Sequence, residues 1–317
     1  MIISVVTPNF NCGSYIESTI RSVLLQEGGF YIDYIIIDGA STDNSLDIIK
    51  KYGELVSGGE PVTHKGIEFR RPALARCKGI RFSWISEPDS GMYDAINKGF
   101  ELAAGQIYAY INADDVYNAE AFRLVNTIFH KHKGIHWIKG RVGKIDARGE
   151  ILSDGRNYLY SLPWIKKGIY GRKLYGLQQE GMFWRPWLWK KSGGFDTRYR
   201  LAGDFYLWRR FADFARLYSV DAGFAWFRAR EGQLSSDRVC YDEEMESISP
   251  CDMALAESID YYLEKSVKLP ATLRKAWYML KFNQKYYFLR NDSRYQKPVF
   301  RPETIRYYEF LSNGRQP

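Results

Sequence analysis

The apolar run at residues 107–111 ends abruptly in a turn that carries two adjacent carboxylates, Asp114 and Asp115. A strand that ends this way presents two anionic oxygen ligands at its tip. Mg²⁺ is held by only one or two protein carboxylates, and waters and substrate phosphates complete its octahedron. The pair therefore favours a site for a divalent cation and a diphosphate-bearing substrate. Adjacent acids at a strand end are also common turn formers and helix caps, so the neighbouring segments decide between the two interpretations.

Three further segments repeat this pattern of an apolar run that ends in polar turn residues. They are residues 2–9, 34–43 and 82–92. Helical patterns lie between or after these runs, at residues 15–24, 45–52, 93–103 and 119–132. This alternation predicts an α/β fold with a parallel sheet, and ligands of open α/β sheets bind in the crevice beyond the carboxyl ends of the strands. The glycine-broken segment 137–146 favours antiparallel additions, and so a mixed sheet.

Four motifs stand in order along these segments: Ser4-Val-Val-Thr-Pro-Asn9, Ile37-Asp-Gly-Ala-Ser-Thr-Asp43, Glu87-Pro-Asp-Ser-Gly-Met-Tyr-Asp-Ala-Ile-Asn-Lys-Gly99 and Asn112-Ala-Asp-Asp115. In this order and spacing they resemble the motifs of the family 2 glycosyltransferases, which have a GT-A fold. The resemblance covers roughly the first 235 residues, apart from an insertion near 53–80. It implies the Rossmann-like fold of nucleotide-diphospho-sugar transferases, a mixed sheet flanked by helices.

The same resemblance suggests how the chain is divided. Residues 1–235 would form the GT-A catalytic domain, with a donor half at about 1–118 and an acceptor half at about 119–235. Residues 236–317 are basic and rich in aromatic residues. We expect them to form a helical C-terminal extension.

The first motifs imply a donor site for a nucleotide-diphosphate sugar. Asp38 would accept a hydrogen bond from the pyrimidine N3–H, and Asp89 would lie near the base and the ribose. The turn that closes the first strand would line the base pocket. The residues expected to contact the donor here are Thr7, Pro8, Asn9, Asp38, Asp89, Gly91, Asn112 and Ala113.

Asp114 fills the third place of the family's Asp-x-Asp metal motif. The first place is Asn112 here, a departure that keeps the metal contact but puts the usual ribose contact in doubt. Asp115 is the expected additional ligand, direct or through water. Mn²⁺ or Mg²⁺ is therefore the implied cofactor.

A second group of motifs, residues 177–185, 193–196 and 201–208, resembles the acceptor half of the family. Asp204 would be the general base that takes the acceptor hydroxyl's proton in an inverting displacement. Its usual acidic neighbour is replaced by Gly203, and a helix N-cap is the alternative role for Asp204. The expected acceptor contacts are Gln179, Glu180 and Trp184, for which strand-edge polar residues and a core or wall tryptophan are the structural alternatives.

The segment 227–235 resembles the loop that closes on the donor diphosphate in related enzymes. A histidine often stands there in place of Arg230. Arginine does not ligate a metal but can clamp a phosphate bidentately, so we expect Arg228 and Arg230 to bind the leaving diphosphate. The alternative is a solvated basic loop.

Positive charge is concentrated at the end of the chain. Residues 265–317 hold twelve Lys and Arg against three Asp and Glu, a net charge of +9, although the whole chain carries only +8. A helical wheel over residues 273–288 gathers Leu273, Ala276, Trp277, Leu280, Tyr287 and Phe288 on one stripe. A basic amphipathic helix of this kind favours contact with an inner-leaflet membrane surface, and packing on the catalytic domain is the alternative. No nucleic-acid-binding motif accompanies the charge.

Other features favour a cytoplasmic enzyme, peripheral at the cytoplasmic membrane if the basic helix binds there. The first expected strand begins at Ile2 and leaves no room for a signal peptide, and no apolar run is long enough to span a bilayer. The four cysteines lack zinc or redox spacing, so we expect free thiols.

Together these patterns predict a metal-dependent, inverting glycosyltransferase. It would move a sugar from a nucleotide-diphosphate donor, UDP-linked by family preference, to a hydroxyl of a glycan or lipid-linked saccharide in bacterial-type surface polysaccharide synthesis. The alternatives are a nucleotide-sugar-binding pseudoenzyme or scaffold, and a sugar nucleotidyltransferase, whose phosphate loop is absent from residues 7–11. The sequence does not identify the sugar, the acceptor or the oligomeric state.

Overall fold

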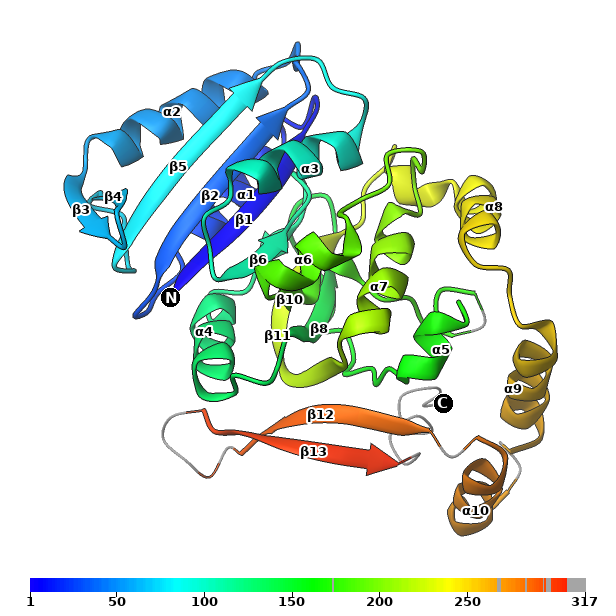
Figure 1. Ribbon diagram of the computed structural model, residues 1–317. Helices are drawn as coiled ribbons and strands as arrows, with labels where there is room; N and C mark the ends of the chain where they lie inside the picture. Colours follow the sequence, from blue (N-terminus) through cyan, green and yellow to red (C-terminus); the bar gives the residue numbers. More distant parts are fainter. Residues whose placement is uncertain (173, 267–268, 283, 293, 295–297, 307–317) are drawn as a thin grey trace.

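The computed structural model describes residues 1–172, 174–266, 269–282, 284–292, 294 and 298–306. These residues form one mixed sheet with helices on both faces (Figure 1). The strands follow one another across the sheet in the order β13-β12-β11-β8-β10-β6-β1-β2-β5-β4-β3, with β7 paired to β11 and β9 paired to β8. The predicted α/β class with a mixed sheet is confirmed.

The strands are β1 (Ile2–Asn9), β2 (Tyr31–Asp38), β3 (Glu60–His64), β4 (Ile67–Arg71), β5 (Gly79–Ser86), β6 (Ile107–Tyr110), β7 (Val116–Tyr117), β8 (Trp137–Ile145), β9 (Ile151–Ser153), β10 (Met182–Trp184), β11 (Leu217–Arg228), β12 (Lys285–Asn291) and β13 (Phe300–Arg306). The α-helices are α1 (Ile16–Leu24), α2 (Ser45–Ser57), α3 (Met92–Leu102), α4 (Ala121–Lys131), α5 (Leu162–Lys166), α6 (Pro186–Ser192), α7 (Gly203–Phe214), α8 (Arg238–Ile248), α9 (Met253–Ser266) and α10 (Ala271–Lys281). Two short 3-10 turns are η1 (Gln179–Gly181) and η2 (Leu234–Ser236).

Four parallel strands, β5, β2, β1 and β6, form the amino-terminal part of the sheet. Their registers place the last residues of three strands side by side, because Asn9 pairs with Asp38 and Asp38 pairs with Ser86. The segment after β6, which carries Asp114, ends at the same edge. The expected meeting of polar strand ends at one edge of the sheet is therefore observed.

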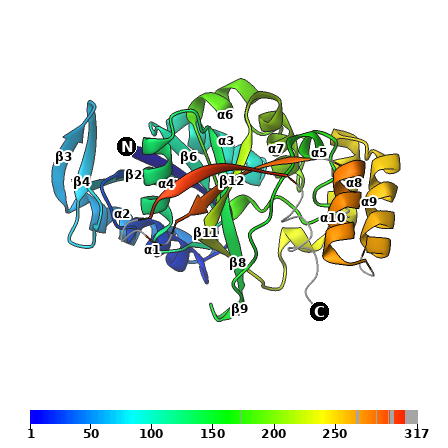
Figure 2. The same cartoon turned by 90° about the horizontal axis from the view of Figure 1, so that it is seen from below.

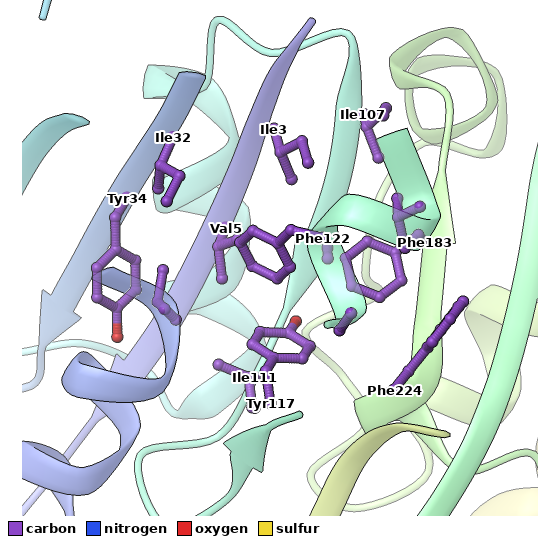
Figure 3. Packing of buried hydrophobic residues seen from close by; sticks show 14 of the residues in the cluster. Ile3, Val5, Ile32, Tyr34, Ile107, Ile111, Tyr117, Phe122, Phe183 and Phe224 are labelled. Carbon is purple, nitrogen blue, oxygen red and sulfur yellow. The ribbon is translucent and has the colours of Figure 1, made fainter. Parts of the chain in front are cut away.

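Alternate residues of these strands enter two apolar cores, one on each face of the sheet. Ile3 and Val5 pack beneath α1, α2 and α4, whereas Val6 packs on the opposite face with α3 and α7. Figure 3 shows the first core, in which Phe122 and Tyr117 lie between the strands and the ring of Phe183. Burial on both faces accounts for the near-continuous apolar character of β1 and β2.

The sheet continues into the second half through β10, which runs antiparallel to both β6 and β8. Beyond it, β8 and β11 are parallel to each other. The strand predicted at residues 137–146 and the antiparallel addition are both confirmed. The insertion near 53–80 forms a hairpin, β3–β4, on the opposite edge of the sheet.

The C-terminal extension is helical through α8, α9 and α10 and then returns to the sheet. β12 pairs in parallel with β11, and β13 completes an antiparallel pair with β12 (Figure 2). The predicted helical stripe over residues 273–288 is therefore wrong beyond Lys281, since Tyr287 and Phe288 lie on β12. Residues 307–317 of the expected membrane-binding tail lie outside the described residues.

Several aromatic residues of the extension pack against the rest of the protein, as the alternative interpretation expected. Phe288 is buried in the second core, and Phe282 packs against Trp164 of α5. Leu273 and Leu280 of α10 remain exposed, at 57% and 87%. Among the described residues, no helix has the length and apolar character needed to cross a membrane.

Candidate active site

The floor of the donor half is a hydrogen-bonded group at the ends of β1, β2 and β5. Asn9 Nδ2 donates to Asp38 Oδ1 at 2.6 Å, and Ser86 Oγ donates to Asp38 Oδ2 at 2.6 Å. Ser41 adds its hydroxyl and its backbone N–H to the same carboxylate. Asp38 is fully buried with two donors on each oxygen, so a base N–H could reach it only by displacing one of them.

Phe10 and Asp89 lie above this floor. Phe10 is 63% exposed although it directly follows a buried strand. A Cβ added to Gly39 would lie 2.8 Å from Asp89 Oδ2 and 3.3 Å from Phe10 Cδ2. Both side chains therefore lie next to Gly39. Phe10 was missed at the sequence level, where an aromatic residue inside the polar turn Asn9-Phe-Asn11 was the available signal.

The other residues predicted for the donor half have mixed positions. The Thr7 hydroxyl is turned into the core, 3.0 Å from the hydroxyl of Tyr34, and Pro8 is buried within β1. Gly91 begins α3 with a φ of 113°, which favours glycine, and donates its N–H to Asp89 Oδ1 at 2.8 Å. Thr7 and Pro8 are therefore both covered within the sheet, whereas Gly91 fixes the orientation of Asp89.

The paired carboxylates after β6 have different surroundings. Asp114 Oδ2 accepts from Arg230 Nε at 2.7 Å, near the surface of the site. Asp115 is fully buried; its Oδ1 accepts from the Arg228 N–H at 2.8 Å, and its Oδ2 has no hydrogen-bond partner among the described residues. Burial, together with the nearby carboxylates of Glu180 and Asp114, raises the pKa of Asp115 well above its usual value.

These residues fit a divalent cation of the kind predicted. The unpartnered Oδ2 of Asp115 and the Asp114 carboxylate supply hard oxygen ligands, and Asn112 Oδ1 is a further buried oxygen without a partner in the described part of the chain. The described residues contain no group of three or more His, Cys, Asp or Glu side chains that could hold a metal alone. A cation here would take its remaining ligands from water and substrate, as Mg²⁺ commonly does.

The two arginines of the 227–235 segment differ in their roles. Arg228 is 5% exposed, and it donates to the carbonyl oxygens of Asp114 and Asp146 and to Ser18 Oγ. These bonds hold the carboxylate turn in place. They use most of the N–H donors of the guanidinium, so few remain to bind a diphosphate. Arg230 is half-buried beside Asp114, so it is the better placed of the two to meet a phosphate.

Glu180 interacts through its charge with a carboxylate of each half, Asp115 in the donor half and Asp204 in the acceptor half. It lies on η1 and is 5% exposed, and burial raises its pKa to about 7. Lys139 of β8 is also buried, which lowers the pKa of its ammonium group to about 8, while Glu180 opposes that shift. The amide of Gln179 has no hydrogen-bond partner in the described residues. Gln179 and Glu180 thus carry buried polar atoms without a hydrogen-bond partner among the described residues, and their contact with an acceptor stays a prediction.

Trp184, the third predicted acceptor contact, lies in the second apolar core. Its side chain is fully buried and packs against Phe100, Tyr110 and Trp208. The inward direction follows from the period of two along β10, which turns Trp184 into the second core. The core alternative describes this residue, and we drop it from the expected acceptor contacts.

Asp204 lies in the first turn of α7 and lines a small cavity. Its Oδ1 accepts from the Phe205 N–H at 2.7 Å and from the Tyr241 hydroxyl at 3.1 Å. Burial raises its pKa to about 6. The N-cap of α7 is Ala202, so the predicted alternative of an N-cap role does not describe Asp204. The cavity is lined by Ile165, Tyr170, Gly171, Gly176, Leu177, Asp204, Phe205, Trp208 and Tyr241.

Helix α3 fixes the acceptor half to the donor half through two side chains one turn apart. The Tyr93 hydroxyl donates to the Leu201 carbonyl at 2.6 Å and accepts from the Asp204 N–H at 3.2 Å. Asn97 exchanges hydrogen bonds with the backbone of Phe195 at 2.9 and 3.0 Å. These residues were not among the predicted site residues, although both belong to the third motif.

The same tyrosine explains why glycine precedes Asp204. A Cβ on Gly203 would lie 2.5 Å from the Tyr93 ring, so no larger side chain fits unless the ring moves. Where related sequences carry an acidic residue, this chain therefore carries Gly203 and places an aromatic ring against it.

Gly203→Ala is expected to lower the free energy of unfolding by about 1–3 kcal/mol, because an added methyl group overpacks a filled site. Urea denaturation would measure the change. Gly134→Ala is the matched control, since nothing lies within 4 Å of a Cβ at that position. Equal stability changes in the two variants would contradict the proposed contact with Tyr93.

The fold and these strand-end carboxylates define a class of α/β enzymes that bind nucleotides at the carboxyl edge of the sheet. Residues 4–146 match the model of the glycosyl transferase family 2. This match, which spans somewhat less than half of the chain, shows that residues 4–146 are similar to the family 2 glycosyltransferases, and the mixed α/β fold agrees with that similarity.

Relatives and solved structures agree with this similarity. The chain is 23% identical over 203 residues to a PGL/p-HBAD biosynthesis glycosyltransferase of Mycobacterium bovis (strain BCG / Pasteur 1173P2), a match that covers 63% of this chain and 66% of the relative, just under two thirds of that protein's length. It is 32% identical over 114 residues to TuaG of Bacillus subtilis (strain 168), provisionally named a teichuronic acid biosynthesis glycosyltransferase, with 36% of each chain covered. S. aureus TarS 1-349, solved with UDP-GlcNAc, has a similar fold, with a TM-score of 0.54, 17% identity, and coverage of 89% of this chain and 76% of that chain.

Proposed function

We propose that this chain is an inverting, metal-dependent glycosyltransferase that transfers a sugar from a UDP-linked donor to a hydroxyl of a saccharide acceptor. The observation that carries the proposal is that two residues, Glu180 and Tyr93, link the donor-side carboxylate turn, residues 112–115, with Asp204 of the acceptor half. The charge of Glu180 interacts with those of both Asp115 and Asp204, and the hydroxyl of Tyr93 in the donor half accepts a hydrogen bond from the backbone N–H of Asp204.

In this proposal the acceptor enters beside Asp204. As the acceptor oxygen attacks the anomeric carbon, Asp204 takes the hydroxyl proton and a new glycosidic bond forms. The bond from the anomeric carbon to the donor diphosphate breaks, and the diphosphate leaves with the electron pair. Asp114 and Asp115 would hold Mn²⁺ or Mg²⁺, which neutralises charge on the leaving group when bound.

Arg230 is proposed to contact the departing diphosphate. Its guanidinium is paired with Asp114. It can turn to phosphate oxygens when a donor and a cation occupy the site, because arginine forms paired hydrogen bonds with phosphate. Arg228 is proposed to act only by fixing the carboxylate turn.

The acceptor is proposed to be a saccharide or a lipid-linked saccharide of surface polysaccharide synthesis, in keeping with the teichuronic acid and PGL/p-HBAD biosynthesis for which the two relatives are named. The cavity beside Asp204 is lined mainly by aromatic and aliphatic side chains, which suit the apolar face of a sugar ring. Contact between the extension and a membrane surface stays a prediction, to which the exposed Leu273 and Leu280 would contribute.

A thermal-shift panel of UDP, dTDP, GDP and CMP, with and without Mn²⁺, tests the donor site. A ligand that binds only the folded state raises the apparent melting temperature. We expect UDP with Mn²⁺ to give the largest shift. No shift with any of the four nucleotides would favour the scaffold alternative, and a larger shift with GDP or dTDP would overturn the choice of UDP.

Phe10→Ala is expected to weaken UDP binding roughly 5- to 150-fold, since stacking of a base on an aromatic ring contributes about 1–3 kcal/mol. Phe10→Trp should retain most of the affinity. Titration calorimetry with UDP and Mn²⁺ measures both. Phe214→Ala, which removes another exposed phenylalanine from the end of α7, is the control. An unchanged affinity in Phe10→Ala would exclude Phe10 from the base site.

A further inference from the structure

Helix α8, in the C-terminal extension, holds the segment that leads into α7. Glu244 accepts three successive backbone N–H groups: Arg200 donates to Oε1 at 2.8 Å, and Leu201 and Ala202 donate to Oε2 at 2.8 and 2.7 Å. Met245, on the same helix, is fully buried against Ala202 and Phe205. The start of α7 is therefore fixed by the extension as well as by α3.

The same helix contacts the carboxylate of Asp204. Tyr241 donates its hydroxyl to Asp204 Oδ1 at 3.1 Å, and the Phe205 N–H donates to the same oxygen at 2.7 Å. No group within the described ranges donates to Oδ2. Tyr241 and Asp204 both line the cavity, so the two oxygens of one carboxylate differ: Oδ1 is held, and Oδ2 has no donor among the residues that the structure describes.

We propose that Tyr241 is a positioning residue that fixes Asp204 Oδ1 and thereby leaves Oδ2 to accept the acceptor's proton. The inference rests on the proposed function, because it assigns an atom to the proposed base. It also makes the extension a part of the active site. Carboxylates are effective bases when their orientation is fixed by neighbouring groups.

The charged and titratable groups around Asp204 set the sign of the expected effect. Tyr93 of α3 and Tyr110 of β6 face it, as do Glu180 of η1 and Glu244 of α8. The hydrogen bond from Tyr241 stabilises the ionised carboxylate and so lowers the pKa of Asp204, while burial and Glu244 raise it. Removal of the hydroxyl should therefore raise this pKa further.

Tyr241→Phe tests the inference, since it removes one oxygen and keeps the ring. In the variant, the acidic limb of the kcat/KM profile should move to higher pH by about one unit, because a hydrogen bond to a charged group contributes at least about 1.5 kcal/mol and one pKa unit corresponds to about 1.36 kcal/mol. At pH 6 the ionised fraction of Asp204 should fall from about one half to about one eleventh, so the loss of activity should be about fivefold, with the KM for the donor unchanged. Tyr52→Phe is the control, because its hydroxyl bonds Glu17 on the far side of the donor half.

A second measurement does not depend on turnover. The pKa of Asp204 can be followed by NMR in protein labelled with ¹³C at the aspartate carboxyl carbons, with Asp204→Asn used to assign the signal. An unchanged pKa in Tyr241→Phe would overturn the role of Tyr241, whether or not the wild type transfers sugar. If the pKa of Asp204 shifts in Tyr241→Phe but the wild type transfers no sugar from any donor, the proposed function is refuted and the positioning contact stands.

Discussion

Asp204→Asn is expected to lower kcat about 1,000-fold while leaving UDP binding unchanged. A general base contributes roughly 100- to 10,000-fold to a rate, and asparagine keeps the shape of the side chain while it loses the ability to take a proton. The pKa of Asp204, raised by burial to about 6, adds a second expectation. Since the base must be ionised, kcat/KM in the wild type should rise with pH through about 6 and then level off.

The control for this variant is Asp213→Asn, which makes the same chemical change on the exposed side of α7, where Asp213 pairs with Lys166. Steady-state kinetics and UDP thermal shifts on the two variants separate catalysis from folding. Turnover within threefold of the wild type in Asp204→Asn would exclude it as the base. Glu180, with a pKa raised to about 7, would then be the next carboxylate to test.

Asp114→Asn is expected to abolish the Mn²⁺-dependent part of the UDP thermal shift and to lower kcat/KM by roughly 100- to 10,000-fold. A metal-bound diphosphate gains several kcal/mol of charge stabilisation as it leaves, and Asp114 is the most accessible carboxylate available to hold that metal. The variant also releases Arg230 from its ion pair. Weak binding of UDP without metal should therefore persist.

Asp47→Asn, on the exposed face of α2, controls for the loss of one negative charge from the donor half. Binding titrations of UDP at fixed Mn²⁺, followed by removal of the metal with a chelator, provide the measurement. If Asp114→Asn kept a full metal-dependent shift, the cation would have to be held by other groups, and the proposed ligand pair would be wrong.

The parts of the site that the sequence predicted are those set by local pattern and parallel register. Segments rich in apolar residues that end in polar turns define β1, β2 and β5, and parallel pairing then brings Asn9, Asp38 and Ser86 together without further information. The sheet class and the position of the carboxylate turn follow from these features.

The remainder depends on contacts between distant segments, which no local pattern encodes. Tyr287 and Phe288 fit a helical stripe in the sequence, but pairing with β11 places them on a strand. Trp184 was expected near the acceptor, but the register of β10 turns it inward. Tyr93 and Tyr241 reach Asp204 from 111 and 37 residues away, so their roles appear only in three dimensions.

The attachment of α7 to both α3 and α8 has a consequence for synthesis of the chain. Domains emerge from the ribosome amino-terminus first, so residues 1–118 can pair their parallel strands while the rest is still being made. Asp204 is held in place only after Tyr241 and Glu244 have emerged. A nascent chain can therefore form the strand edge that carries Asn9, Asp38 and Ser86 well before Asp204 is fixed in place.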